Sequence, residues 1–162
     1  MLRRVLGPWL VGPLEHVGST AVPGLGAKPV IDMMGAVETL DRSKPAIAAV
    51  KESGYLYAPY RADQEHWFCK PSPSFRTHHL HLVPLGSRAW IAAIAFRDRL
   101  RADRAAAAEY LTLKRDLCSR YQHDREAYTE GKSQFVKRIV DEELRKITPA
   151  FDHDRCPGSR HS

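Results

Sequence analysis

The sequence predicts an α+β fold in which a small mixed β-sheet packs against helices and the C-terminal half is helical. Short apolar segments separated by turns rich in Gly and Pro, a pattern typical of strands, lie before Pro84. From Ser87 onward, apolar residues recur every three or four positions, which is typical of amphipathic helices. Strands followed by a run of helices, without internal repeats, indicate the α+β class.

Length and composition are those of one globular domain. The chain has 162 residues, of which 43% are hydrophobic and 27% are charged. We expect the domain to span residues 1–147, and we expect residues 148–162, which lack periodicity, to form a flexible tail. No apolar run approaches the roughly 18 residues that a membrane span needs, so no membrane association is expected.

The N-terminus and the cysteines bear on cellular location. The first residues, M-L-R-R-V-L-G-P-W-L-V, are basic and then apolar, but no small-residue cleavage site follows, so we expect no signal peptide. Cys69, Cys118 and Cys156 are widely spaced and form no C-x-x-C motif, which is typical of reduced thiols. We therefore expect a cytoplasmic protein.

The charge of the chain favours an anionic partner. The net charge is +6, but acidic residues alternate with basic ones, as in R-D-R-L-R-A-D-R. Most of this charge is therefore expected on solvated helix faces. A nucleotide or another anionic small molecule is the expected partner, and nucleic acid is not.

Turn and capping residues mark the expected elements. Strands are expected at residues 14–17, 29–37, 55–57, 65–70 and 77–83. Helices are expected at residues 2–6, 41–53, 87–101, 103–121, and from 124 or 129 to about 146. Asp41 or Ser43 can cap the second helix and Asp103 the fourth, because their side-chain oxygens can accept hydrogen bonds from first-turn amides.

A glycine turn between the first two strands is the first candidate binding feature. Gly18 can adopt a positive φ or let a ligand approach the backbone closely. The backbone amides that follow Ser19 are then free to face an anion. We predict an anion site at Gly18, Ser19 and Thr20.

Asp32 is the single charge in the apolar strand expected at 29–37. Because strand side chains alternate between faces, Asp32 shares a face with Val30 and Met34. A carboxylate in such a strand is costly unless it is paired, hydrogen-bonded or bound to a metal. We predict a functional role, and the alternative is a structural ion pair with Lys28 or Arg76.

Two histidines form the second candidate feature. His79 and His81 share one face of their strand. If this strand lies beside that of Asp32, the three side chains converge, and Glu15 or His16 can join them. Such a cluster can hold a divalent metal ion, of unknown identity, or act as general acid and base, so Asp32, His79, His81 and Glu15 are the candidate catalytic residues. The alternative is that the histidines are core residues hydrogen-bonded to backbone.

Scattered basic residues form the third feature, because lysine and arginine side chains bind phosphate and carboxylate oxygens. Lys28 is the foremost of these, since it lies between the glycine turn and Asp32. Ordinary surface charge is the alternative for each. The residues assigned to phosphate or substrate binding are Lys28, Lys70, Arg76, Arg97, Lys114 and Lys132, and Arg101 and Arg125 are further basic residues of this kind.

Five separated motifs between residues 14 and 142 resemble the signature of the GrpB-like family. They are E-H-V-G-S-T-A-V-P-G-L-G-A-K-P-V-I-D, R-T-H-H-L-H-L-V, F-R-D-x-L-R, Y-L-x-L-K and D-R-E-A-Y-T-E-G-K. The resemblance implies a nucleotidyltransferase superfamily fold like that of polymerase beta, and members of the family also occur fused to dephospho-CoA kinases. Members usually have a longer N-terminal leader, so we expect either a truncated start or a partner that covers the exposed face.

The superfamily pattern implies roles for particular residues. In that pattern a Gly-Ser pair grips a triphosphate and two or three carboxylates hold metal ions, which matches Gly18-Ser19 and Asp32. The second carboxylate position falls on Met34, and the third falls on the strand of His79 and His81. Methionine is no ligand for magnesium, a hard ion that prefers oxygen. The resemblance therefore implies an altered metal site.

These observations leave three functional hypotheses. The first is an enzyme, a nucleotidyltransferase-like transferase that acts on a nucleotide or another phosphorylated or anionic small molecule. The second is a metal- or histidine-assisted lyase, cyclase or ligase in the same pocket, which the methionine at position 34 favours. The third is a non-catalytic binding module for a nucleotide or coenzyme. The sequence does not specify the oligomeric state.

Overall fold

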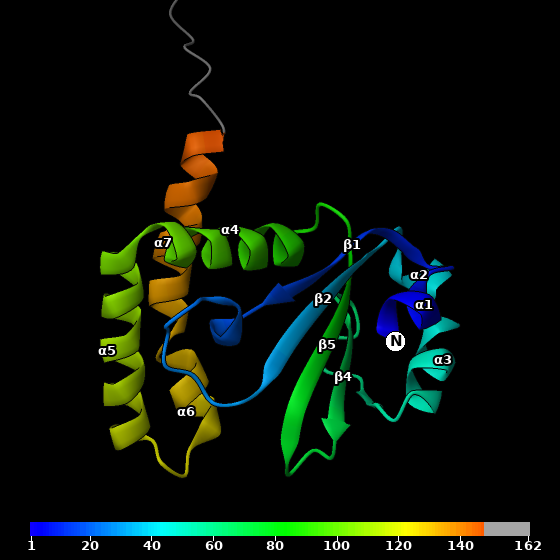
Figure 1. Cartoon of the computed structure of the whole chain (residues 1–162), viewed down its shortest axis with the longest axis horizontal. Helices are drawn as coiled ribbons and strands as arrows, with labels where there is room; N and C mark the ends of the chain where they lie inside the picture. Colours follow the sequence, from blue (N-terminus) through cyan, green and yellow to red (C-terminus); the bar gives the residue numbers. More distant parts are fainter. Residues whose placement is uncertain (148–162) are drawn as a thin grey trace, which may run out of the picture.

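A five-stranded mixed sheet with helices on both faces forms the centre of the molecule (Figure 1). This computed structural model describes residues 1–147. The strand order is β1-β2-β5-β4-β3. The strands are β1 (Leu10–Val17), β2 (Ile31–Val37), β3 (Leu56–Ala58), β4 (His66–Pro71) and β5 (Arg76–Pro84).

The helices fall into two groups, one on each side of the sheet in Figure 1. The first group is α1 (Leu2–Leu6), α2 (Leu40–Ser43) and α3 (Ala46–Glu52). The second group is α4 (Arg88–Ala102), α5 (Arg104–Arg120), α6 (Arg125–Glu130) and α7 (Ser133–Ile147). A short 3-10 helix, η1 (Ser19–Ala21), follows β1. None of the helices within residues 1–147 combines the length and apolar character that crossing a membrane requires.

The pairing of β2 with β5 sets the geometry of the sheet. These two strands are parallel, whereas β1–β2, β4–β5 and β3–β4 are antiparallel. Asp32 is in register with His79, and Met34 is in register with His81. Residues in register on neighbouring strands point to the same face, so Asp32 and the two histidines share one face.

Each face of the sheet carries its own hydrophobic core. On one face, Leu80, Leu82 and Phe68 are fully buried in a core that includes residues of α1 and α3. On the other face, Val17, Met34 and Val83 form a smaller core that packs against α4. A third core joins α4, α5 and α7 to the segment after η1, and its buried members are Val22, Leu100, Ala106, Tyr110, Phe135 and Ile139.

The expected α+β fold, with a small mixed sheet and a helical C-terminal half, is confirmed. All five expected strands are present, although β1 begins at Leu10, four residues before the expected start at Leu14. The expected flexible tail, residues 148–162, lies outside the described residues, and the domain boundary at 147 stays a prediction.

Two of the expected helices are interrupted. The helix expected at 41–53 is divided into α2 and α3, because Pro45 lies between them and lacks the amide hydrogen that a continuous helix needs. Thr39, rather than Asp41 or Ser43, caps α2 by accepting a hydrogen bond from the Arg42 amide. The last expected helix is divided into α6 and α7 at Gly131. Gly131 packs closely against Leu117 of α5, since a Cβ at this position would lie 2.4 Å from Leu117 Cδ2.

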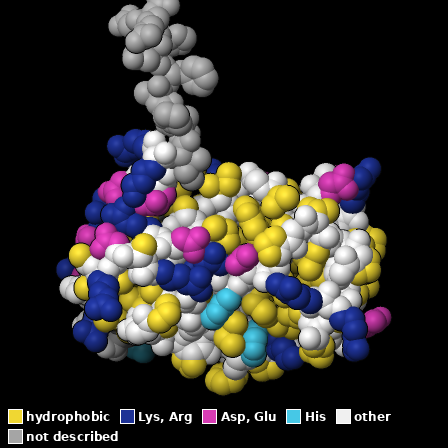
Figure 2. Space-filling view, turned by 45° about the horizontal axis from the view of Figure 1, so that its top comes forward, with side chains coloured by type: hydrophobic (Ala, Val, Ile, Leu, Met, Phe, Trp, Pro, Cys, Tyr) yellow, Lys and Arg dark blue, Asp and Glu magenta, His cyan; other side chains and the backbone are white. Residues whose placement is uncertain are grey.

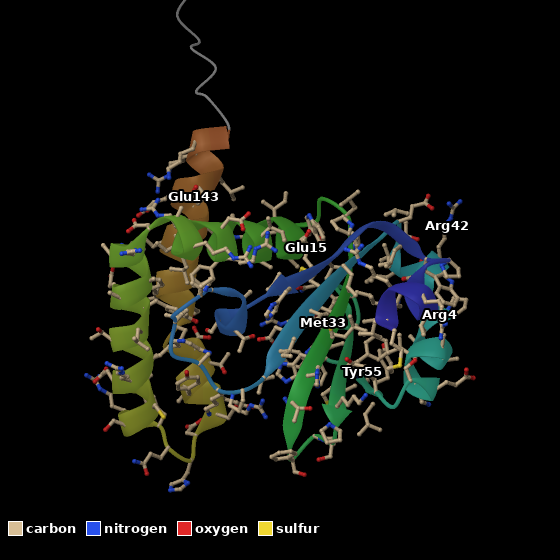
Figure 3. The ribbon with its side chains drawn as sticks, in the orientation of Figure 1. Arg4, Glu15, Met33, Arg42, Tyr55 and Glu143 are labelled. Carbon is tan, nitrogen blue, oxygen red and sulfur yellow. The ribbon has the colours of Figure 1, made fainter. Side chains whose placement is uncertain are left out.

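Arg97 joins α4 to β1 through a nearly buried ion pair. Its side chain is 9% exposed, and its Nη1 donates to Glu15 Oε2 at 2.5 Å and to the His16 carbonyl at 3.1 Å. Nε of Arg97 also donates to Asp98 Oδ1 at 2.7 Å. In Figure 3, Glu15 lies close to α4. A buried charge of this kind is costly to leave without its partner.

We predict that Arg97→Met lowers the free energy of unfolding by about 2 kcal/mol, because the partly exposed Glu15 would lose its partner and the His16 carbonyl would lose its donor. The matched control is Arg42→Met. Arg42 also pairs with a glutamate, Glu38, but the two side chains are 72% and 56% exposed, so its loss should cost less than about 1 kcal/mol. Urea unfolding followed by circular dichroism measures both, and equal losses would contradict a structural role of Arg97.

Candidate functional site

The β2–β5 pairing brings Asp32 and the two histidines together, as predicted. Oδ1 of Asp32 lies 2.7 Å from Nδ1 of His79. One possible ligand atom from each of Asp32, His79 and His81 lies within 4.8 Å of the others. Among the described residues, Asp32 forms no ion pair with Lys28 or Arg76, the alternative considered for it. A cluster of one carboxylate and two imidazoles can bind a divalent metal ion or transfer protons.

The glycine turn is built around the Asp32 carboxylate. Gly18 has φ +72°, a conformation that L side chains rarely adopt. A Cβ on Gly18 would lie 2.5 Å from Oδ2 of Asp32, well inside van der Waals contact. Glycine at this position therefore allows the turn after β1 to approach β2 and leaves room for the carboxylate.

His81 is held by a carboxylate that the sequence analysis did not identify. Nδ1 of His81 lies 2.5 Å from Oε2 of Glu65, the residue immediately before β4. Trp67 lies beside both imidazoles, with its ring centroid 5.3 Å from that of His79 and 6.5 Å from that of His81. Figure 2 shows histidine side chains at the surface of one face, next to basic and apolar side chains.

A pocket of about 600 Å³ extends from Asp32 and His79 toward the helical half of the molecule. On the sheet side, its walls are the turn after β1 and the strands β2 and β5. On the helical side, they are α5, α6 and Lys132, which lies between α6 and α7. The polar and charged lining residues are Ser19, Thr20, Lys28, Asp32, His79, Lys114, Arg115, Cys118, Arg125, Tyr128, Thr129 and Lys132. The pocket is hereafter called the basic pocket.

Five basic side chains face this pocket, and Asp32 is the one carboxylate in its lining. Within residues 1–147, none of the five forms an ion pair with a carboxylate. They are Lys28, Lys114, Arg115, Arg125 and Lys132. By contrast, some arginines elsewhere on the helices, such as Arg97 and Arg99, are paired. An excess of unpaired cations in a concave site favours binding of an anion.

Burial and mutual repulsion act on the lysines of the basic pocket. Burial, together with the charge of Lys132, lowers the pKa of Lys114. Burial also lowers the pKa of Lys132, where the charges of Lys28 and Arg125 act in the same direction and that of Asp32 opposes them. Lys28 and Lys132 both lie over the ring of Tyr128, at 5.3 Å and 4.3 Å from its centroid. An anion in the pocket would relieve this repulsion.

Ser19 is joined to the helical half by Lys114. Nζ of Lys114 donates to Oγ of Ser19 at 3.2 Å and to the carbonyl of Gly26 at 2.6 Å. The Ser19 hydroxyl also lies within hydrogen-bonding reach of the Tyr110 phenol. Thr20 differs, since its hydroxyl donates to the Val30 carbonyl at 3.0 Å. Burial raises the pKa of Tyr110, which packs behind Lys114, to about 12.

The structure brings some of the predicted binding residues into the basic pocket and leaves others outside it. Ser19, Thr20, Lys28, Lys114 and Lys132 line the pocket, and Gly18 adjoins it through Asp32. Asp32 and His79 also line it, whereas His81, which faces the same side of the sheet, does not. The other four candidates, Glu15, Lys70, Arg76 and Arg97, do not line it either.

Each of these four has another contact that accounts for its position. Glu15 and Arg97 pair with each other at the junction of β1 and α4. Lys70 lies over the ring of Tyr55, at 5.3 Å from its centroid. Arg76 stacks on Trp67 at 4.9 Å and donates to a backbone carbonyl. Burial, together with the charge of Arg125, lowers the pKa of Arg76. Their predicted roles therefore have no support from the geometry.

Sequence reasoning missed several residues of the site, among them Arg115, Tyr128 and Glu65. Arg115 and Tyr128 line the basic pocket, and Glu65 holds His81. Tyr128 lies in the D-R-E-A-Y-T-E-G-K motif, which offered a signal. Glu65 offered none, because its contact depends on how β4 pairs with β5.

The fold and the site together define a class: an α+β protein with a pocket lined by basic side chains beside a carboxylate–imidazole cluster. The family model described as GrpB protein matches residues 1–142, and this chain belongs to the GrpB family.

Relatives of known sequence agree with this assignment. The chain is 35% identical over 147 residues to the glutamate-rich protein GrpB of Alkalihalophilus pseudofirmus, covering 88% of this chain and 84% of the relative. It is 40% identical over 131 residues to a UPF0157 protein of Pseudomonas aeruginosa, covering 78% of this chain. It is 31% identical over 136 residues to the UPF0157 protein YqkA of Bacillus subtilis, covering 84% of this chain. The match spans 53% of the Pseudomonas protein and 39% of the Bacillus protein.

A solved structure shares the fold. The crystal structure of conserved protein GrpB from Enterococcus faecalis aligns with a TM-score of 0.79 and 32% sequence identity. The alignment covers 90% of this chain and 87% of the Enterococcus chain. The mixed sheet and its flanking helices are therefore shared with a family member.

We predict that Gly18→Ala displaces the Asp32 carboxylate, because the new Cβ would lie 2.5 Å from Oδ2. Gly24→Ala is the matched control, since Gly24 has a similar φ of +75° but no heavy atom within 4 Å of the position that its new Cβ would take. Both variants should lose about 1–3 kcal/mol through backbone strain. Only Gly18→Ala should also change the imidazole NMR signals of His79, and unchanged signals would contradict the close packing of Gly18 on Asp32.

Proposed function

We propose that this protein is an enzyme that binds a phosphorylated small molecule, such as a nucleotide, in the basic pocket and acts on it with a divalent metal ion. One observation carries the proposal: five basic side chains face the pocket without a carboxylate partner within residues 1–147. Lys114 is buried and Lys132 is half-buried, whereas Lys28, Arg115 and Arg125 are exposed. The two less exposed cations are costly to keep unpaired, so an anion that pairs with them, and with the three at the pocket rim, would bind favourably.

The shape of the site supports a small molecule over a nucleic acid. A volume of about 600 Å³ is typical of pockets that enclose small ligands and cofactors. The unpaired cations converge on this concavity, whereas a nucleic-acid surface would need them along an extended stripe. Phosphate suits the site better than a single carboxylate, because several oxygens are needed to engage lysines from α5 and from the α6–α7 junction.

Asp32, His79 and His81 supply the residues for chemistry. Their donor atoms fit a divalent ion, since one carboxylate oxygen and two imidazole nitrogens come within 4.8 Å of one another. When bound, such an ion supplies Lewis-acid polarisation of a phosphoryl oxygen. The chain itself contributes the charge of Lys114 and Lys132 toward the phosphate and the Ser19 hydroxyl as a hydrogen-bonding group.

The resemblance to nucleotidyltransferases supports the transferase hypothesis, but Met34 favours a second candidate. Met34 is 6% exposed and packs with Val17 and Val83 under α4, so its position belongs to the apolar core. Ordinary nucleotidyl transfer needs carboxylates that clamp two metal ions. We therefore propose as the alternative a lyase, cyclase or ligase reaction in the same pocket. A non-catalytic nucleotide- or coenzyme-binding role is the outcome if no ligand is converted.

Two assays separate these functions. A thermal-shift panel of nucleotides and divalent ions tests binding, and pyrophosphate release from each nucleoside triphosphate tests nucleotidyl transfer. Release that Asp32→Ala abolishes would support the transferase. Stabilisation by a nucleotide without release would favour the alternative chemistry or a binding module. Absence of stabilisation by any phosphorylated compound would overturn the proposal.

We predict that Lys114→Met and Lys132→Met each weaken the binding of inorganic pyrophosphate by about 10-fold or more, because each removes a charge-assisted hydrogen bond to phosphate. Lys51→Met, on the exposed side of α3 and away from the pocket, removes the same charge and should leave the affinity unchanged. Isothermal titration calorimetry measures all three, and an equal loss in Lys51→Met would indicate only a general charge effect.

We predict that anion affinity falls as the pH rises through the lowered pKa values of Lys114 and Lys132, below their ordinary value of 10.5. The direction follows because protonated lysines bind the anion and neutral lysines do not. Sulfate is a suitable probe, since its charge is constant over this range. Titration from about pH 7 to about pH 10 would show the decline, and a constant affinity throughout would refute a role of these two ammonium groups.

A further inference from the structure

Glu65 is a carboxylate near the proposed metal centre to which neither the family motifs nor the transferase pattern assigns a role. It lies immediately before β4, and its side chain is 13% exposed. Its Oε2 lies 2.5 Å from Nδ1 of His81, on the strand next to β4. A glutamate with so little exposure needs a partner, and His81 is the partner it has.

The two histidines are held in the same manner by different carboxylates. Nδ1 of His79 contacts Asp32, and Nδ1 of His81 contacts Glu65. The two rings are perpendicular, with centroids 6.4 Å apart. With Nδ1 of His81 engaged by Glu65, Nε2 is the atom that His81 can offer to a ligand. Nε2 of His79 is buried and has no hydrogen-bond partner among the described residues.

We propose that Asp32, His79 and His81 form a two-imidazole, one-carboxylate centre for a first-row transition ion, and that Glu65 is its positioning residue. The proposal rests on the proposed function, because it specifies the metal ion of that site. Histidine ligands commonly donate their second ring nitrogen to a carboxylate, which fixes the tautomer and the ring orientation and raises the basicity of the ligating nitrogen. Glu65 occupies that place for His81.

The donor set favours zinc, cobalt or a similar ion over magnesium. Imidazole nitrogen suits transition ions, whereas magnesium requires near-octahedral oxygen ligands and retains its waters. Of the three proposed ligands, Asp32 alone supplies oxygen. The neighbouring position that could supply a second oxygen holds the buried Met34. The site as built therefore lacks the oxygens that would select magnesium.

Trp67 provides a built-in reporter of metal binding. Its ring lies 5.3 Å from that of His79 and 6.5 Å from that of His81. A paramagnetic ion such as Co²⁺ bound by these histidines would quench Trp67 fluorescence. The Trp67→Phe variant identifies the signal, because the remaining tryptophans, Trp9 and Trp90, are not part of this cluster.

The experiment titrates the full-length chain, without an affinity tag, with Co²⁺ and Zn²⁺ and follows the Co²⁺ absorption and the Trp67 fluorescence. Wild type should bind Co²⁺ in the presence of a large excess of Mg²⁺, and His81→Gln should not. Glu65→Gln, which keeps an acceptor but no charge, should weaken Co²⁺ binding by about 10-fold, and Glu65→Leu by up to about 100-fold. Glu52→Gln, at an exposed glutamate on α3, is the control and should bind as wild type.

Each outcome decides a separate point. Wild-type affinity in either Glu65 variant would overturn the positioning role, and if Glu65→Leu does not fold, Glu65→Gln decides it alone. Displacement of Co²⁺ by Mg²⁺, or no Co²⁺ binding at all, would overturn the transition-metal centre. Pyrophosphate binding is measured in parallel with a chelator present. If it persists while the metal experiment fails, the proposed function survives without this centre, and if pyrophosphate does not bind, the proposed function fails independently of Glu65.

Discussion

The parallel register between β2 and β5 is the constraint on which the rest of the molecule depends. A shift of one residue would turn His79 and His81 toward the α1–α3 face and would expose the apolar residues between them. Leu80 and Leu82 prevent this shift, because both are fully buried in the core on that face. The same alternation thus secures the hydrophobic core on one side and the carboxylate–imidazole cluster on the other.

Ion pairing differs between the arginines that anchor helices and the cations of the basic pocket. Arginines that hold helices in place are paired, as Arg97 is with Glu15 and Arg99 is with Glu143. The basic pocket departs from this rule, since Lys114 and Lys132 are kept close together and poorly hydrated. Stability would be better served by placing carboxylates beside them. Such departures are typical of binding sites, where function is retained at a cost to stability.

Local patterns predicted the fold class and the contact between Asp32 and His79, because both follow from the two-residue repeat of strands. They did not predict that Arg97 is structural, since a basic residue on a helix has the same local sequence whether it meets a ligand or Glu15. The pairing of Glu65 with His81 and the break at Gly131 also depend on tertiary contacts. Sequence therefore predicted the clustering of Asp32 with the histidines at the sheet but not the partners that support it.

The basic pocket is assembled from distant parts of the chain, which has a consequence for folding. Lys114 reaches Ser19 across 95 positions and Gly26 across 88, whereas the β4–β5 hairpin joins near neighbours in sequence. Long-range contacts of this kind close large loops and form late. All five strands are complete by Pro84, before any residue of α5 has been synthesised. On the ribosome, the sheet can therefore form first, and the emerging chain acquires its pocket only after α5 and α6 have left the exit tunnel.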